Sequence, residues 1–132
     1  MGLDIYLKDP TSTYETESLW EGNLTHNLTD MAEAVGIYEA VWRPYRLLKH
    51  YDKIFCNDPE NESDFEMFNV VIGELIIPII EKGLKKLKEN PEYYKKYDSP
   101  NDWGTYKDFV KFLEEYLTAL KKYPKSIVIT DR

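Results

Sequence analysis

The sequence predicts an α+β domain, mainly helical, in which three or four helices pack on a small sheet. Alternating apolar and polar residues, typical of strands, occur near both ends of the chain. Between them, apolar residues recur at the spacing of amphipathic helices. An isolated strand would leave its backbone polar groups unpaired, so we expect the N-terminal and C-terminal strands to pair. A length of 132 residues suits one domain, residues 1–132.

The two strands have clear signals. Leu3–Leu7 alternates apolar and polar residues, and Asp9-Pro10 should end this strand. Ser126–Thr130 is the second strand. Polar turn-forming residues dominate 11–22, so we expect a loop there, with a short strand near Ser18–Trp20.

A first helix should begin at Asn27, Thr29 or Asp30. Asp30 is followed three residues later by a glutamate, which is the spacing of a capping box. Pro44 disfavours helix at the residue before it, so we expect the helix to end near Trp42.

The longest predicted helix follows an acidic loop. Residues 45–51 should form a short helix, and 57–63 should form the loop. Ser63–Glu66 has capping-box spacing and opens an apolar stripe that continues to residue 87. Pro78 lies within this stripe and should kink or split the helix, which Asn90-Pro91 should end.

The last part of the chain has conventional helix signals. Residues 92–97 should form one helical turn, and 98–104 should form a loop that contains Trp103. Thr105 has the position of a helix cap, and Pro124 should close the helix that it opens.

Composition and charge restrict the classes of function. The formal net charge of -7 argues against binding to nucleic acids or to anionic membranes. The apolar run 72–80 is too short to span a bilayer, and no secretion signal is visible, so we expect a cytoplasmic protein. One cysteine, Cys56, and two histidines exclude an internal disulfide and a His-rich metal site. The many acids leave a carboxylate-rich metal site open, but none of them show metal-loop spacing, and we expect neither a metal nor a cofactor.

The densest polar stretch, residues 23–28, precedes the first helix, and we call it the polar segment. Asn23, Thr25 and Asn27 alternate with two leucines, and His26 could act as a hydrogen-bond donor or proton shuttle. Free N–H groups at the following helix N-terminus could hold an anion or a carbonyl. The plainer interpretation is that these residues cap a helix and that His26 is a half-buried packing residue.

Two further places combine polar and aromatic residues. Arg43, between Trp42 and Pro44, could pair with a carboxylate or phosphate, or could simply form a salt bridge beside a core tryptophan. Trp103 and Tyr106 flank a glycine and a threonine and could stack on a base or sugar, or could staple the start of a helix.

Six stretches of the chain, one of which contains the polar segment, together form a recognisable pattern. They are Gly22-Asn23-Leu24-Thr25-His26-Asn27-Leu28-x-x-Met31-Ala32, Gly36-Ile37-Tyr38, Trp42-Arg43-Pro44, Leu3-Asp4-Ile5-Tyr6-Leu7, Trp103-Gly104-Thr105-Tyr106 and Tyr123-Pro124. Together these stretches resemble a pattern in small uncharacterised proteins of bacteriophages and prophages. The resemblance implies a phage-related origin, and hence a host-cell cytoplasm, but it assigns no catalytic residue.

Three functions fit the sequence. The first is a non-enzymatic binder of a small polar ligand, such as an anti-defence protein that sequesters a nucleotide-type host signal. Its ligand-binding residues would be Asn23, Thr25, His26, Asn27, Arg43, Trp103 and Tyr106. The second is an acidic inhibitor or immunity-type protein that binds a host protein through the acidic stretch 58–66. The third is an enzyme that uses His26 as acid and base. In any of them a second copy of the chain could complete the site.

Overall fold

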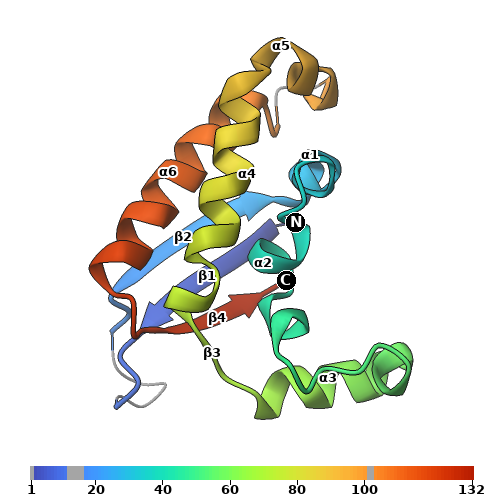
Figure 1. The fold of residues 1–132 in the computed structure, drawn as a ribbon, viewed down its shortest axis with the longest axis vertical. Coiled ribbons are helices and arrows are strands. Elements are labelled where there is room, and N and C mark those ends of the chain that lie inside the picture. Colours follow the sequence, from blue (N-terminus) through green and yellow to red (C-terminus); the bar gives the residue numbers. More distant parts are fainter. Residues whose placement is uncertain (1, 12–16, 101–102) are drawn as a thin grey trace.

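The computed structural model describes residues 2–11, 17–100 and 103–132. Within them an antiparallel sheet is covered on one face by helices (Figure 1), which confirms the predicted α+β class. The strand order is β2-β1-β4-β3. The strands are β1 (Gly2–Lys8), β2 (Trp20–Thr25), β3 (Val71–Ile72) and β4 (Ile127–Asp131).

Strand β1 occupies the middle of the sheet and shows the alternation that its sequence predicted. The side chains of Leu3, Ile5 and Leu7 are fully buried on the inner face, and those between them lie on the outer face. β1 pairs antiparallel with β4, so the predicted pairing of the two terminal strands is confirmed. The N- and C-terminal ends consequently lie near each other (Figure 1).

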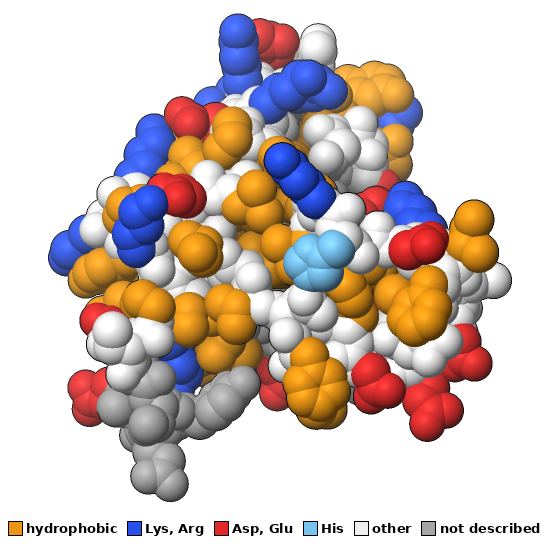
Figure 2. Space-filling model, turned by 60° about the horizontal axis from the view of Figure 1, so that its bottom comes forward, with side chains coloured by type: hydrophobic (Ala, Val, Ile, Leu, Met, Phe, Trp, Pro, Cys, Tyr) orange, Lys and Arg blue, Asp and Glu red, His pale blue; other side chains and the backbone are white. Residues whose placement is uncertain are grey.

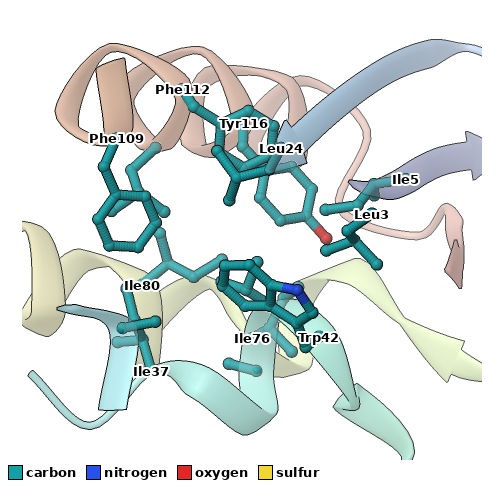
Figure 3. Packing of buried hydrophobic residues seen from close by; sticks show 14 of the residues in the cluster. Leu3, Ile5, Leu24, Ile37, Trp42, Ile76, Ile80, Phe109, Phe112 and Tyr116 are labelled. Carbon is teal, nitrogen blue, oxygen red and sulfur yellow. The ribbon is translucent and has the colours of Figure 1, made fainter. Parts of the chain in front are cut away.

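Two long helices, α4 (Ile77–Glu89) and α6 (Tyr106–Lys122), lie side by side across the inner face of the sheet (Figure 1). Their apolar stripes meet the sheet and the ring of Trp42 in one core (Figure 3). The predicted start of α6 is confirmed, because the Thr105 hydroxyl accepts a hydrogen bond from the Asp108 backbone N–H. None of the helices in the described ranges is long and apolar enough to cross a membrane.

The first predicted helix is two helices, α1 (Thr29–Ala34) and α2 (Tyr38–Trp42). Gly36 separates them with a φ of 77°, a conformation that glycine adopts without a Cβ clash. The expected capping role of Asp30 is wrong, because Leu28 is the N-cap residue and makes no side-chain cap. The break at Gly36 replaces a continuous rod with a bend.

The prediction for the middle of the chain is wrong in two respects. The acidic loop is the start of α3 (Pro59–Phe68), where the Asp58 side chain accepts a hydrogen bond from the Glu60 N–H at 2.8 Å. Pro59 fits this start because the first helical residues need no N–H partner. The same rule applies to Pro78, which opens α4 instead of kinking a longer helix.

Between α3 and α4 the chain is extended. Val71 and Ile72 form β3, which pairs with β4, and the ladder continues where the Gly73 N–H donates to the Ser126 carbonyl at 2.8 Å. Pairing at the sheet edge therefore interrupts the apolar stripe that suggested one long helix.

The remaining elements connect these parts. The single turn expected after the longest helix is α5 (Pro91–Tyr94), and 3₁₀ turns cover His26–Leu28, Pro44–Leu47, Phe55–Asn57, Gly73–Leu75 and Lys95–Tyr97. The predicted loop at 11–22 is shorter than expected at its end, because β2 begins at Trp20, and residues 12–16 of it lie outside the described part.

Candidate functional site

Part of the polar segment meets the loop that carries Trp103. The Asn27 side-chain amide donates to the Trp103 carbonyl at 2.8 Å, and the Thr25 hydroxyl accepts from the Asn27 N–H at 3.3 Å. Gly104, with φ 106°, packs closely on this contact, since an added Cβ would lie 2.8 Å from Thr25 Cγ2. The structure therefore brings Thr25, Asn27 and Trp103 together, and the Trp103 side chain remains exposed.

His26 is half-buried beside the core residue Trp42. The Trp42 indole N–H donates to His26 Nδ1 at 2.9 Å. An indole nitrogen only donates, so neutral His26 must carry its proton on Nε2. The bend at Gly36 makes this contact possible, because it returns the end of α2 to the polar segment. His26 thus has a structural role at one nitrogen of its ring.

Arg43 belongs to a different group of contacts. Its Nε donates to the Tyr38 hydroxyl at 3.2 Å, and its guanidinium also donates to the Tyr45 hydroxyl at 3.0 Å. Burial opposes the charge of Arg43, but these two hydroxyls outweigh that effect and raise its pKa. The Tyr38 ring stacks on Trp42, so Arg43 reaches His26 only through intermediate aromatic side chains.

The two remaining predicted residues lie elsewhere. Asn23 stands opposite Asp4 on the outer face of the sheet. The Tyr106 hydroxyl donates to the Leu87 carbonyl at 2.8 Å and thereby ties the start of α6 to α4. The residues predicted to bind one ligand are consequently spread over several places, and only the contact around Asn27 joins distant parts of that set.

A cluster of charged side chains holds α3 against the body of the protein. It uses all three arginines of the chain, Arg43, Arg46 and Arg132. Arg46 pairs with Glu62 at 2.6 Å. Arg132 contacts both carboxylate oxygens of Glu66, at 2.6 and 2.8 Å, in the bidentate geometry that a guanidinium permits.

A groove of about 380 Å³ opens beside this cluster, between the end of α3 and β4. We call it the α3 groove. Its lining is mainly apolar and consists of Lys8, Asp9, Pro44, Tyr45, Glu66, Met67, Asn69, Val70, Val71 and Ile127–Thr130. At one place on its wall the Thr130 hydroxyl donates to Glu66 at 3.3 Å. Its volume lies in the range of sites that hold small ligands or single anchoring side chains.

The rim of the α3 groove is unusually apolar for an exposed surface. Met67 is 69% exposed, Phe68 79% and Val70 58%, and Ile72 follows on β3. No residue of α3 is buried, so this helix directs its apolar side chains outward as well as inward. Figure 2, which brings the lower side of Figure 1 forward, shows hydrophobic side chains across this face and acidic ones toward the α3 side.

Sequence reasoning missed the α3 groove, although one signal was present. Residues 65–72 are Phe-Glu-Met-Phe-Asn-Val-Val-Ile, which is too apolar on all sides for a helix with one buried stripe. Met67 and Val70 fall outside the stripe, so a helix that buries only the stripe leaves them exposed. Such exposed apolar residues in a group mark an interaction surface.

The fold and the groove define an α+β protein with an apolar groove between a helix and a sheet edge. Among the described residues, no group of three His, Cys, Asp or Glu side chains is placed to hold a metal ion. Comparison of the chain with protein-family models, curated proteins and solved structures finds no match.

Proposed function

We propose that this protein is a non-enzymatic protein-binding module whose interaction surface is the α3 groove and its rim. One observation carries the proposal: Met67, Phe68 and Val70 are all more than half exposed beside an apolar groove. Leaving such side chains in water forgoes about 25 cal/mol for each Å² of apolar surface that a partner would bury. The proposal corresponds to the second function that the sequence suggested, an acidic inhibitor or immunity-type protein. It adds an apolar surface to the acidic surface of residues 58–66.

The partner's surface should be complementary in charge. α3 contains the acids Glu60, Glu62, Asp64 and Glu66 and no basic residue. Arginines neutralise Glu62 and Glu66, whereas Glu60 and Asp64 have no ion pair with the described residues. A partner with basic residues around an apolar centre fits this surface, and electrostatic attraction would speed its association.

Site-specific cross-linking tests the proposal. A photoreactive p-benzoylphenylalanine at position 68 should give one discrete cross-linked product in cells that make the protein. The same amino acid at position 93 is the control, because Tyr93 is also an exposed aromatic residue but lies on α5. Equal yields from both positions, or no product from position 68, would contradict the assignment of this face.

The contact around Asn27 supports a second candidate function, the binding of a small polar ligand. Trp103 is 70% exposed and could stack on a planar ligand such as a nucleotide, while the Asn27 side chain holds the backbone of the same loop. A rise in melting temperature with one member of a nucleotide and cyclic-nucleotide panel would support it. That rise should disappear in Trp103→Ala, and a rise that persists there would refute the location.

A further inference from the structure

The edge of β4 beside the α3 groove has an incomplete ladder. β3 contributes only Val71 and Ile72, opposite Val128 and Ile127. β4 itself continues through Asp131, so its last three residues run beyond the end of β3. Edge backbone groups without a partner strand can pair with a strand from another chain.

The register shows which backbone groups are affected. In an antiparallel ladder, alternate residues direct both their N–H and C=O to the same neighbouring strand. The Ser126 carbonyl accepts from the Gly73 N–H, so Ser126, Val128 and Thr130 face the β3 side. The N–H and C=O of Thr130 therefore point to that edge, where they have no backbone partner in the described part of the chain.

Asn69 would have to supply the missing rung, but it is held elsewhere. Its side-chain amide donates to the Phe65 carbonyl at 2.7 Å, and its side-chain oxygen contacts His50 Nε2. These bonds keep Asn69 at the end of α3 and away from β4. The gap between the departing chain and β4 is the α3 groove, which both segments line.

We infer that the α3 groove binds an extended, basic segment of a partner protein, which pairs with β4 at Thr130 and places an apolar side chain in the groove. The inference rests on the protein-binding function proposed above. Strand addition would satisfy the Thr130 backbone, while Met67 and Val70 would cover the apolar side chain.

Charge selects the occupant. Asp64 lies one helical turn before Met67 and Phe68, and Glu60 one turn before Asp64, so these acids follow the helix surface that leads to the groove. Because both acids lack ion pairs with the described residues, lysines or arginines that flank the apolar side chain would find partners there. A second copy of this acidic chain fits this surface less well than a basic segment does.

Peptide binding, measured by fluorescence anisotropy on the full chain, tests the inference. The probe is labelled acetyl-Lys-Lys-Val-Leu-Val-Lys-Lys-amide, and its matched controls replace every Lys with Ser or with Glu. We expect saturable binding of the basic peptide, weaker by about tenfold for the serine peptide and absent for the glutamate peptide. Equal binding of the basic and serine peptides would overturn the charge selection.

An N-methyl scan of the probe tests strand pairing. Methylating the one backbone nitrogen that faces Thr130 should weaken binding by about tenfold, while methylation of its two neighbours should have little effect. If no position responds, the segment docks by side chains alone and the pairing with β4 is refuted.

Variants of the protein locate the peptide. Met67→Ser and Val70→Ser should each weaken binding by about tenfold without unfolding, because both side chains are already exposed. Tyr93→Ser is the matched control and should bind the peptide normally, because Tyr93 is also exposed but lies on α5. If all three variants bind alike, the peptide lies elsewhere and the inference fails.

The remaining outcomes separate this inference from the proposed function. A discrete cross-link at position 68 with no peptide binding would keep the protein-binding function and overturn the strand mode. If sedimentation shows dimers that Met67→Ser disperses, a second copy occupies the groove, which also overturns the inference. Loss of both the cross-link and peptide binding would remove the proposed function as well.

Discussion

Replacing His26 with alanine removes the acceptor for the indole proton of Trp42. Trp42 is 1% exposed, and its hydrogen bond to His26 is 2.9 Å long. Stranding a buried N–H donor costs about 1–3 kcal/mol. For a domain of this size each kcal/mol corresponds to about 3–5 °C, so His26→Ala should lower the melting temperature by roughly 3–15 °C.

A double-mutant cycle isolates this bond. Trp42→Phe removes the N–H donor, so His26→Ala should cost about 1–2 kcal/mol less in that background than in the wild type. Urea unfolding followed by far-UV circular dichroism measures all four proteins. His26→Gln, which retains a side-chain acceptor, should recover part of the loss. Additive effects of the two substitutions would refute the hydrogen bond as a source of stability.

Three other predictions concern stability. The Tyr116 hydroxyl is buried and has no hydrogen-bond partner among the described residues. Tyr116→Phe should therefore leave the unfolding free energy unchanged or raise it by up to about 1 kcal/mol in urea titrations, and a clear loss would contradict this. An added Cβ at Gly83 would lie 2.3 Å from Ile37 Cγ2, so Gly83→Ala should lower the unfolding free energy by about 1–3 kcal/mol in thermal melts. Within the Ile37→Ala background, where the clashing side chain is gone, adding Gly83→Ala should cost less. Burial disfavours the charge of Glu62, but hydrogen bonds, chiefly from Arg46, outweigh it and lower its pKa. Glu62 therefore stabilises the fold above the carboxyl pKa of the unfolded chain, which is about 4.3, and this contribution disappears as the pH falls through the folded pKa. The unfolding free energy should consequently fall less between pH 6 and pH 3 in Glu62→Gln than in the wild type.

The parts of the fold that local sequence determines were predictable. The alternation in Leu3–Leu7 and the cap at Thr105 gave β1 and the start of α6. The pairing of the terminal strands followed from the need to satisfy their backbones, and it holds in the register of β1 and β4. The break between α1 and α2 was not predicted, because a helical pattern tolerates a glycine unless tertiary contacts favour a positive φ there.

Pro78 shows why the middle of the chain was harder. A proline in a helical pattern fits both a kink and a first turn, and local sequence does not distinguish the two. Because Val71 and Ile72 pair with β4, the helix cannot run through them, and Pro78 lies in the first turn of a new helix. That pairing joins residues far apart in the chain. Tertiary context of this kind commonly overrides local propensity.

The groove was beyond local reasoning for the same reason. Arg132 and Glu66 are 66 residues apart in sequence, and Asn27 and Trp103 are 76 apart, so no spacing pattern relates them. Sequence did identify Asn27 and Trp103 as interesting separately, and the structure places them in contact. The sequence could not indicate that all three arginines of the chain contact acids of one helix, α3.

The way in which α3 is held determines how that helix opens. With no buried residue, it depends on the ring of Phe65 against Tyr45 and Tyr51 and on the ion pairs of Glu62 and Glu66. Salt screens such partly exposed pairs, whereas α6 is held mainly by a buried apolar stripe that charge screening does not weaken. Amide hydrogen exchange in α3 should therefore be faster than in α6 and should accelerate with ionic strength, since α3 can detach as a local unit while the core stays folded. One wall of the groove should thus open in an equilibrium of its own, which shifts with the ionic strength of the surrounding solution.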